Sequence, residues 1–171
     1  MTKTLINKKT KKLLHELLKD SSRSDRELGK AIGVSQPTVS KMKKNLREKG
    51  VIQGFTMIPD FSKMGYNLLA FTFVKPKGIL SSSSELKKST EIAKKWLNEQ
   101  ANVVFADSCR GLGMHAFMIS FHTSYQDFDK FIKNHNQKLG CLLDDVKSCL
   151  VNLAGDDTLK PFHFKYLADN T

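Results

Sequence analysis

We predict an α+β protein in which a winged helix-turn-helix domain precedes a ferredoxin-like βαββαβ domain. Apolar residues recur every three or four positions up to about residue 50, and strand-like and helical segments alternate from residue 67 onwards. Residues 1–50 contain 14 Lys and Arg against 5 Asp and Glu, a net charge of +9, whereas residues 51–171 contain 14 against 12, a net charge of +2. A small domain that carries most of the positive charge predicts a polyanionic partner.

Residues 24–50 predict two short helices joined by a tight turn. Ser24 and Glu27 have the spacing of a capping box, in which each side chain accepts a backbone N–H of the other residue. Gly33 falls where a chain leaving a helix often adopts a positive φ, and Ser35 can cap the second helix. A preceding helix over residues 10–19 completes a three-helix domain. Its predicted core consists of Leu14, Leu17, Leu28, Ile32, Val39, Met42 and Leu46.

The outer face of the second of these two helices predicts DNA recognition. Small hydrogen-bonding side chains at its start suit base edges in a major groove, and the cations behind them suit phosphates. The residues that we expect to contact double-stranded DNA are Ser35, Gln36, Pro37, Thr38, Ser40, Lys41, Lys43, Lys44 and Arg47. The other interpretation is a solvated basic helix in an unrelated helical hairpin.

The sequence divides into three parts: residues 1–58, a helix-turn-helix DNA-binding domain; residues 59–66, a linker; and residues 67–171, a ferredoxin-like domain with a C-terminal extension. Residues 51–58 have the composition of a strand and are predicted to pack beside the helices. Pro59 and Asp60 end this strand and begin the linker.

The second domain is predicted to run strand, helix, strand, strand, helix, strand. A capping-box pair, Ser82 and Glu85, marks the start of its first helix after a serine-rich loop. The predicted segments are residues 67–75, 82–99, 102–109, 114–122, 124–139 and 146–153. In the extension, Phe162, Phe164 and Tyr166 alternate, which predicts a further edge strand.

The predicted strands are apolar on both faces. In residues 114–121, one face consists of His115, Phe117, Ile119 and Phe121, and the opposite face is also largely apolar. The helices of this fold cover one face of the sheet, so the other predicts an association surface. We therefore expect a homodimer, or a larger oligomer, built sheet to sheet. The other interpretation is that the extension folds back over this face within one chain.

This arrangement resembles the Lrp/AsnC family of prokaryotic transcription regulators over about residues 8–153. The resemblance is carried by RELGKAIGVSQPTVSKMKKNLREKGVIQGFTMIPDFSKMGYNLLAF and, more weakly, by the hairpin CRGLGMHAF. Gly50 to Phe55 match the family's G-V/I-I-x-G-Y/F stretch. The resemblance implies dimers that pair through the C-terminal sheet, often assemble into octamers and bind roughly palindromic operator DNA.

The resemblance also implies an amino-acid effector near the loop between the second and third strands, at interfaces between dimers. The corresponding residues here are Asp107, Arg110, Gly111, Leu112 and Gly113. Family members commonly have Gly-Asp-x-Asp in this loop, whereas this chain has Gly-Leu-Gly-Met, so an α-amino group would lack its carboxylate partners. The other interpretation is a hairpin whose glycines serve the turn geometry alone.

Composition disfavours several other classes of protein. The Cys and His residues lack metal-ligand spacing, and the three cysteines predict reduced thiols, so we expect a cytoplasmic, nucleoid-associated protein without metal or cofactor. No apolar run approaches about 20 residues, and we expect neither a membrane span nor a secretory signal.

Two alternatives to a transcription regulator stay open. One is a tetrapyrrole decarboxylase of related architecture that uses Arg110, His115 and His122, and the other is a general DNA-organising protein; we expect no enzymatic activity.

Overall fold

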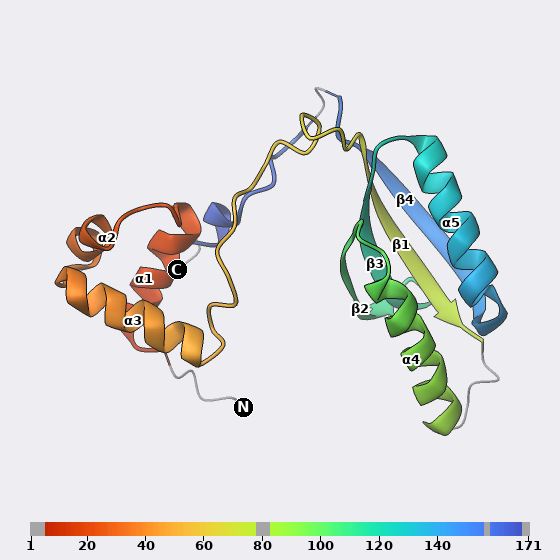
Figure 1. The fold of residues 1–171 in the computed structure, drawn as a ribbon, viewed down its shortest axis with the longest axis horizontal. Helices are drawn as coiled ribbons and strands as arrows, with labels where there is room; N and C mark the ends of the chain where they lie inside the picture. The colour runs from red at the N-terminus through yellow and green to blue at the C-terminus, as the bar shows by residue number, and fades with distance from the viewer. Residues whose placement is uncertain (1–5, 78–82, 156–157, 169–171) are drawn as a thin grey trace. The chain divides into compact units, whose positions relative to one another are not determined.

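The computed structural model describes residues 6–77, 83–155 and 158–168. They form two compact units, whose helices and strands are labelled in Figure 1. The first unit comprises the described residues up to Ile58 together with those from Lys160 onwards, and the second runs from Pro59 to Leu159. The last part of the C-terminal extension therefore belongs with the helix-turn-helix and not with the sheet.

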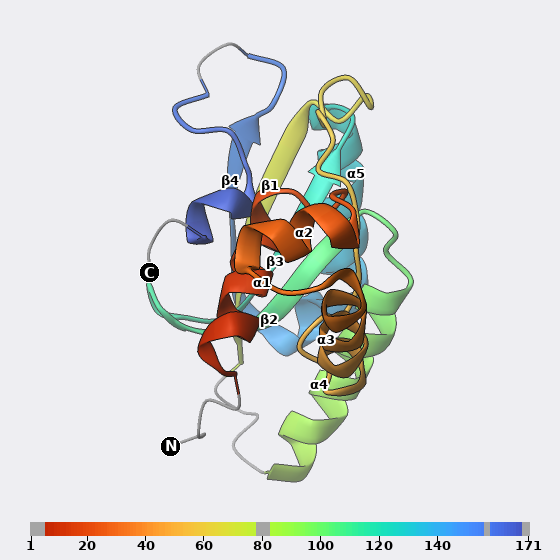
Figure 2. The same ribbon diagram turned by 90° about the vertical axis from the view of Figure 1, so that its left-hand side faces the viewer.

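Three helices build the first unit and cross one another (Figures 1 and 2). They are α1 Lys8–Lys19, α2 Asp25–Ile32 and α3 Gln36–Glu48. The predicted capping box before α2 is confirmed: the Glu27 N–H donates to Ser24 Oγ at 3.3 Å, and the Ser24 N–H donates to Glu27 Oε2 at 2.8 Å. Gly33 ends α2 with φ 70°, also as predicted. Both ends of α2 are thus fixed by residues that the sequence identifies.

The core of the first unit centres on Leu13 of α1 and Leu28 of α2, which are fully buried. The sequence prediction placed Leu14 and Met42 in this core, but both are only partly buried at its edge. Leu13 takes the central place because it lies one helical turn before the buried Leu17, so the two side chains share one face of α1. The other predicted core residues are buried as expected.

The strand predicted over residues 51–58 is not formed. A strand needs a neighbouring backbone to complete its hydrogen-bond ladder, and the described part of the first unit contains no other strand. The chain instead leaves α3 through Gly50, with φ 67°, and the Ile52 N–H donates to the Leu46 carbonyl at 3.1 Å. The segment after α3 therefore continues as extended chain without a wing hairpin.

Gly29 of α2 sets how closely the turn after this helix can return. A Cβ at this position would lie 2.7 Å from the Val34 carbonyl oxygen, which is closer than real Cβ atoms come to other atoms. The Val34 N–H also donates to the Gly29 carbonyl at 2.9 Å. The missing side chain thus lets the backbone of the turn lie directly against α2 and brings the start of α3 to its place.

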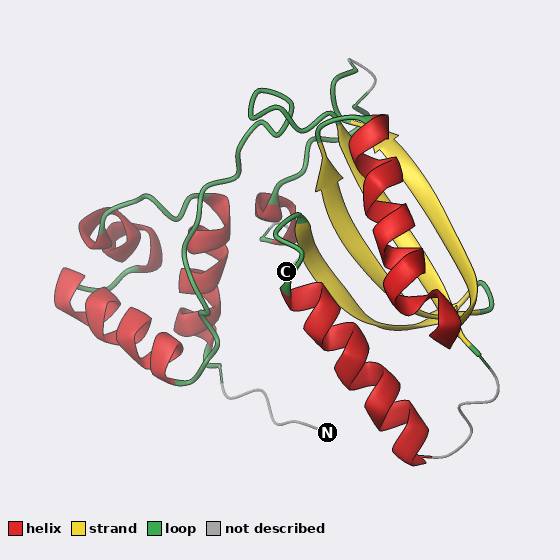
Figure 3. Cartoon of the chain, turned by 45° about the vertical axis from the view of Figure 1, so that its right-hand side comes forward, coloured by secondary structure: helices red, strands yellow, loops and turns green. Residues whose placement is uncertain are grey.

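Four strands and two helices build the second unit, with the predicted βαββαβ order. They are β1 Leu68–Pro76, α4 Ser83–Asn98, β2 Val103–Gly111, β3 Met114–His122, α5 Tyr125–Leu139 and β4 Leu143–Asn152, with a short 3₁₀ helix η1 Gly140–Leu142 before β4. The sheet order is β2-β3-β1-β4, and all neighbours are antiparallel. Figure 3 shows α4 and α5 on the same face of the sheet. The predicted Ser82–Glu85 capping box involves Ser82, which lies outside the described residues.

The two faces of the sheet differ in what covers them. Ala70 and Met118 face the helices and are buried against Trp96, Phe128 and Phe131. The opposite face is also apolar, as predicted, and includes Phe71, Phe73, Phe105, Phe117, Ile119 and Val151. On that face the Phe73 and Phe117 rings stack with centroids 6.0 Å apart, and the Phe105 side chain is 49% exposed. Among the described residues of the second unit, no helix lies over this second face (Figure 3).

The C-terminal extension does not form the edge strand predicted for it. The predicted edge strand is wrong, because Phe164–Leu167 form a 3₁₀ helix, η2, in which the His163 ring nitrogen Nδ1 accepts the Lys165 N–H at 2.9 Å. This local cap closes a turn, which is incompatible with a continuous strand. The last part of the extension, η2, packs on α1 within the first unit.

Replacing Gly29 tests the close approach in the turn. Gly29→Ala should lower the free energy of unfolding by about 1–3 kcal/mol, because the methyl group must displace the Val34 backbone. Urea denaturation followed by circular dichroism measures this change. The matched control is Gly54→Ala, since a Cβ at Gly54 would meet nothing within 4 Å. Equal stability of the two variants would contradict a close approach that Gly29 alone permits.

Candidate nucleic-acid interface

Helix α3 presents one buried and one exposed face. Val39 and Leu46 anchor it in the core, with exposed fractions of 0% and 3%. The opposite face carries most of the residues predicted to contact DNA: Gln36, Thr38, Ser40, Lys41, Lys44 and Arg47 are all exposed. Short polar side chains thus stand at the N-terminal end of the face and cations towards its C-terminal end, in the order that the sequence predicted.

The start of α3 is arranged differently from the prediction. Ser35 occupies the N-cap position, but its side chain accepts no backbone N–H. Its hydroxyl instead forms a hydrogen bond of 2.8 Å with the Thr38 hydroxyl. Pro37 follows in the first turn, where its missing N–H costs no intrahelical bond. The two exposed hydroxyl groups therefore form one polar pair at the end of the helix that carries Gln36.

Lys43 is the exception among the predicted cations. Its Nζ lies 2.9 Å from Asp25 Oδ1, and the two side chains are only 23% and 21% exposed. This half-buried pair joins α3 to the first turn of α2, so it fixes the angle between the two helices of the motif. By contrast, Lys44 lies 4.0 Å from Glu48 with its side chain 79% exposed, and it is available to a partner in solution.

Phe55 belongs to this site although the sequence prediction did not place it there. Its ring lies beneath two cations of α3, with the centroid 5.4 Å from Lys43 Nζ and 4.9 Å from Arg47 Cζ. A cation over an aromatic face is attracted to the ring's negative quadrupole. The extended chain after α3 therefore holds Arg47 in place. The only signal in the sequence was the Gly50–Phe55 stretch, which does not reveal the contact.

The loop between β2 and β3 forms a tight hairpin. Leu112 and Gly113 both have positive φ, 54° and 71°, and Gly111 pairs with Met114, which is the geometry of a two-residue type I′ turn. The Leu112 side chain is 84% exposed. Asp107 lies further along β2, and its carboxylate accepts the N–H of the neighbouring Ser108 at 2.6 Å. The glycines thus serve the turn, and the structure brings no carboxylate to its tip.

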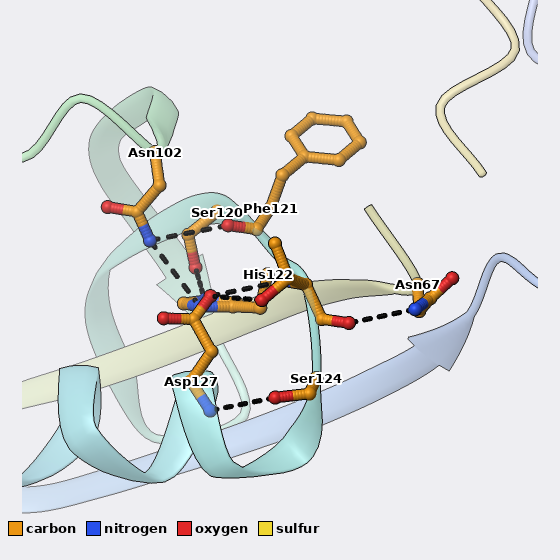
Figure 4. Close-up of polar contacts among 8 residues, drawn as sticks. Asn67, Asn102, Ser120, Phe121, His122, Ser124 and Asp127 are labelled. Carbon is orange, nitrogen blue, oxygen red and sulfur yellow. Dashed lines mark hydrogen bonds and ion pairs between the residues drawn. The ribbon is translucent and has the colours of Figure 1, made fainter. Parts of the chain in front are cut away.

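A buried polar cluster at the end of β3 has the residue types of a catalytic triad (Figure 4). His122 Nε2 lies 2.8 Å from Ser120 Oγ, and His122 Nδ1 lies 3.6 Å from Asp127 Oδ2. Ser120 and His122 are both 0% exposed, however, so no substrate reaches the hydroxyl. Burial lowers the pKa of His122, and the Asp127 carboxylate only partly opposes this effect. The cluster joins the end of β3 to the start of α5 and is structural.

The same burial bears on the tetrapyrrole alternative. Of the side chains considered for it, Arg110 and His115 are exposed, but His122 is enclosed and cannot touch a ligand of that size. Among the described residues, no group of three or more His, Cys, Asp or Glu side chains is placed to hold a metal ion. No helix in the described chain is long and apolar enough to cross a membrane.

A three-helix unit whose third helix has one face in the core and an exposed basic face defines a helix-turn-helix DNA-binding protein. Residues 6–53 match the family model for winged helix-turn-helix DNA-binding domains. The HTH-type transcriptional regulator LrpA of Pyrococcus horikoshii is 30% identical over 104 residues, which cover 60% of this chain and 74% of LrpA. The regulator FL11 of Pyrococcus furiosus is 39% identical over 84 residues, which cover 48% of this chain and 56% of FL11.

Solved structures share the fold at low sequence identity. An AsnC family transcriptional regulator from Agrobacterium tumefaciens has a TM-score of 0.73 at 20% identity, covering 91% of this chain and 94% of its own. The regulator NMB0573 of Neisseria meningitidis, solved in complex with L-Met, has a TM-score of 0.72 at 16% identity, covering 85% and 89%. The chain belongs to the Lrp/AsnC family and is a DNA-binding transcriptional regulator, not an enzyme.

Removing the partner of Lys43 should release a cation to DNA. In Asp25→Asn the Lys43 ammonium group loses its carboxylate, so affinity for random duplex should rise at low salt, and the log–log slope of affinity against salt should steepen by about 1 per protomer. Fluorescence anisotropy across a salt series measures both quantities. Asp129→Asn is the matched control, because it frees Lys133 on α5 with the same change of charge. An equal effect of the two variants would contradict the assignment.

Acid should destabilise the second unit through its buried imidazoles. Burial lowers the pKa of both His122 and His135, so the unfolded chain binds more protons than the folded one below the ordinary His pKa of about 6.5. The free energy of unfolding should therefore fall as the pH decreases from 7.5 to 5.5, by at most about 1.4 kcal/mol per pH unit for each His. Denaturant titrations at several pH values should show a shallower decline for His122→Asn than for the exposed-site control His115→Asn.

Proposed function

We propose that this regulator binds operator DNA as a homodimer and reads it with the exposed face of α3. In this proposal Gln36, Thr38 and Ser40 approach base edges, since Gln pairs bidentately with adenine and hydroxyl groups serve several bases. Lys41, Lys44 and Arg47 lie on phosphates. The observation that carries the proposal is the exposure of this whole set on one face of a helix whose other face is anchored in a core.

Dimerisation is supported by the uncovered face of the sheet. Its centre is apolar, with Phe71, Phe73, Phe117 and Ile119 on β1 and β3, while Asp107 of β2 and Lys147 of β4 lie at its edges, and large apolar patches on soluble proteins mark association surfaces. A second copy would bury this surface and double the number of bases that one molecule reads. Selection of bound sequences from random duplexes tests this step. A two-fold motif with half-sites about 34 Å apart supports the dimer, and the absence of any motif favours a general DNA-organising role.

Effector binding at the β2–β3 hairpin is a finer part of the proposal. NMB0573 was solved with L-Met, and in this chain the exposed Arg110 beside Gly111 is suited to an amino acid's carboxylate. Leu112 and Met114 offer nothing to an α-amino group. We therefore expect any amino acid to be held here through its carboxylate alone and with low affinity. Calorimetry with a panel of amino acids and their N-acetylated forms tests this, because acetylation should leave the heat unchanged.

The phosphate contacts give a measurable salt dependence. Three free cations per protomer, without Lys43, make six phosphate contacts per dimer and predict a log–log slope of about −5. The triple variant Lys41→Ala, Lys44→Ala, Arg47→Ala should bring the slope close to zero for every sequence. The control replaces three exposed lysines of α5, Lys130, Lys133 and Lys138, with alanine. A slope that follows total charge rather than position would overturn the assigned surface.

A further inference from the structure

A cavity of about 520 Å³ lies between the helices and the sheet of the second unit, and it opens to solvent, since Ala106 and Ser108 on its wall are exposed. Its walls come from α4 and α5, from η1, and from residues of all four strands. The residues of the β2–β3 turn, Arg110 to Gly113, do not line it. The cavity is therefore distinct from the hairpin at which the proposed function places an effector.

Several residues around this space have small side chains. They include Ala93 of α4, Ala106 of β2 and Ala116 of β3. The wall is predominantly apolar. If each atom takes the roughly 30 Å³ of a liquid water, the cavity holds about ten to fifteen non-hydrogen atoms with space to spare. Pockets of this size and character are typical of small-molecule sites.

One buried polar side chain, His135 of α5, lines the cavity and is 2% exposed. Its Nδ1 lies 3.1 Å from Asn136 Oδ1, and because an amide oxygen only accepts, Nδ1 carries the hydrogen. Burial lowers the pKa of His135, so the ring is neutral and its Nε2 keeps a lone pair. Among the described residues nothing bonds to Nε2, and no fully enclosed polar side-chain atom lacks a partner, so Nε2 is not fully enclosed. Nε2 is thus an acceptor that opens onto the cavity.

Two other polar groups of the wall, on Thr72 and Trp96, are already engaged. The Thr72 hydroxyl is fully buried and pairs with the Ser148 hydroxyl at 2.9 Å. The Trp96 indole N–H donates to Asn134 Oδ1 at 2.9 Å, and its ring meets the His135 ring edge to face at 5.2 Å. The charged side chains along the wall, Lys94 and Asp107, are exposed to solvent. A charged ligand would therefore lose its hydration without finding a buried counter-charge.

We propose that this cavity binds a small, uncharged, largely apolar molecule that carries one hydroxyl or N–H donor, and that the donor bonds to His135 Nε2. The site lies wholly within one chain, so it needs neither a second protomer nor DNA. It selects against zwitterionic amino acids, because the described wall offers no buried group of opposite charge to their ammonium and carboxylate groups. This ligand class differs from the one proposed for the hairpin.

The chain contains a single tryptophan, and Trp96 lines the cavity, so its fluorescence reports occupancy directly. The probe is 4-tert-butylcyclohexanol, which does not fluoresce and has 11 non-hydrogen atoms, within the range of about ten to fifteen estimated above. We expect a saturable change in the emission of the full chain, with a Kd of about 0.1 mM. The charged analogue 4-tert-butylcyclohexanecarboxylate and L-leucine should give no saturable change.

Two variants locate the probe. Ala93→Phe fills the cavity and should abolish the response, whereas Ala101→Phe, at an exposed position outside the cavity, should retain it. His135→Phe keeps the ring but removes the acceptor, and it should weaken alcohol binding about fivefold. If Ala93→Phe fails to fold by circular dichroism, His135→Phe and the charged analogue decide.

The proposal is overturned by the absence of a saturable change in the wild-type chain, by an unchanged response in folded Ala93→Phe, or by equal binding of the alcohol and the carboxylate. Unchanged alcohol affinity in His135→Phe overturns the role of His135. Because these measurements contain no DNA, a failure here leaves the DNA-binding proposal untouched, and a loss of DNA binding leaves the cavity proposal untouched.

Discussion

The close approach of the chain to itself at Gly29 is the constraint on which the DNA-binding unit depends. A methyl group at this position would collide with the Val34 carbonyl, so the short turn between α2 and α3 exists in this form only because that position has no side chain. The Lys43–Asp25 ion pair also joins α3 to the start of α2 and so fixes the angle between these two helices. Phe55 beneath Arg47 adds a third contact on the extended chain. Together these contacts decide which side chains of α3 face outwards.

A comparable constraint organises the second unit, where both helices must lie on one face of a four-stranded antiparallel sheet. The helix-facing side is closed by Trp96, Phe128 and Phe131, yet a cavity with alanines in its wall lies beside the neutral His135. The other side remains apolar and uncovered, which suits a second copy of the chain. The same sheet thus has a cavity on one side and an apolar face on the other, and the proposed ligand site and the proposed dimer depend on these two features.

Much of the architecture was predictable because it depends on contacts between neighbours in sequence. The Ser24–Glu27 capping box, the positive φ of Gly33 and the βαββαβ order all follow from local spacing, and all are confirmed. Two strand predictions that were made from local patterns are wrong. Residues 51–58 have strand composition but no strand beside them, and the alternating aromatic residues 162–166 close into a 3₁₀ turn under the His163 cap. The pattern of residues in a segment shows that it could form a strand, but it does not show whether another strand lies beside it to complete the hydrogen bonds.

The sequence by itself determined the class of protein, the basic reading helix and the apolar character of both sheet faces, since these depend on residue type and period. Only the tertiary structure decided that Lys43 is held by Asp25, that Phe55 supports Arg47 and that His122 is enclosed and cannot be catalytic. It also decided that η2 packs on α1 within the first unit. Each of these depends on contacts between different elements or beyond the end of a helix, and the periodicity within one element does not encode such contacts.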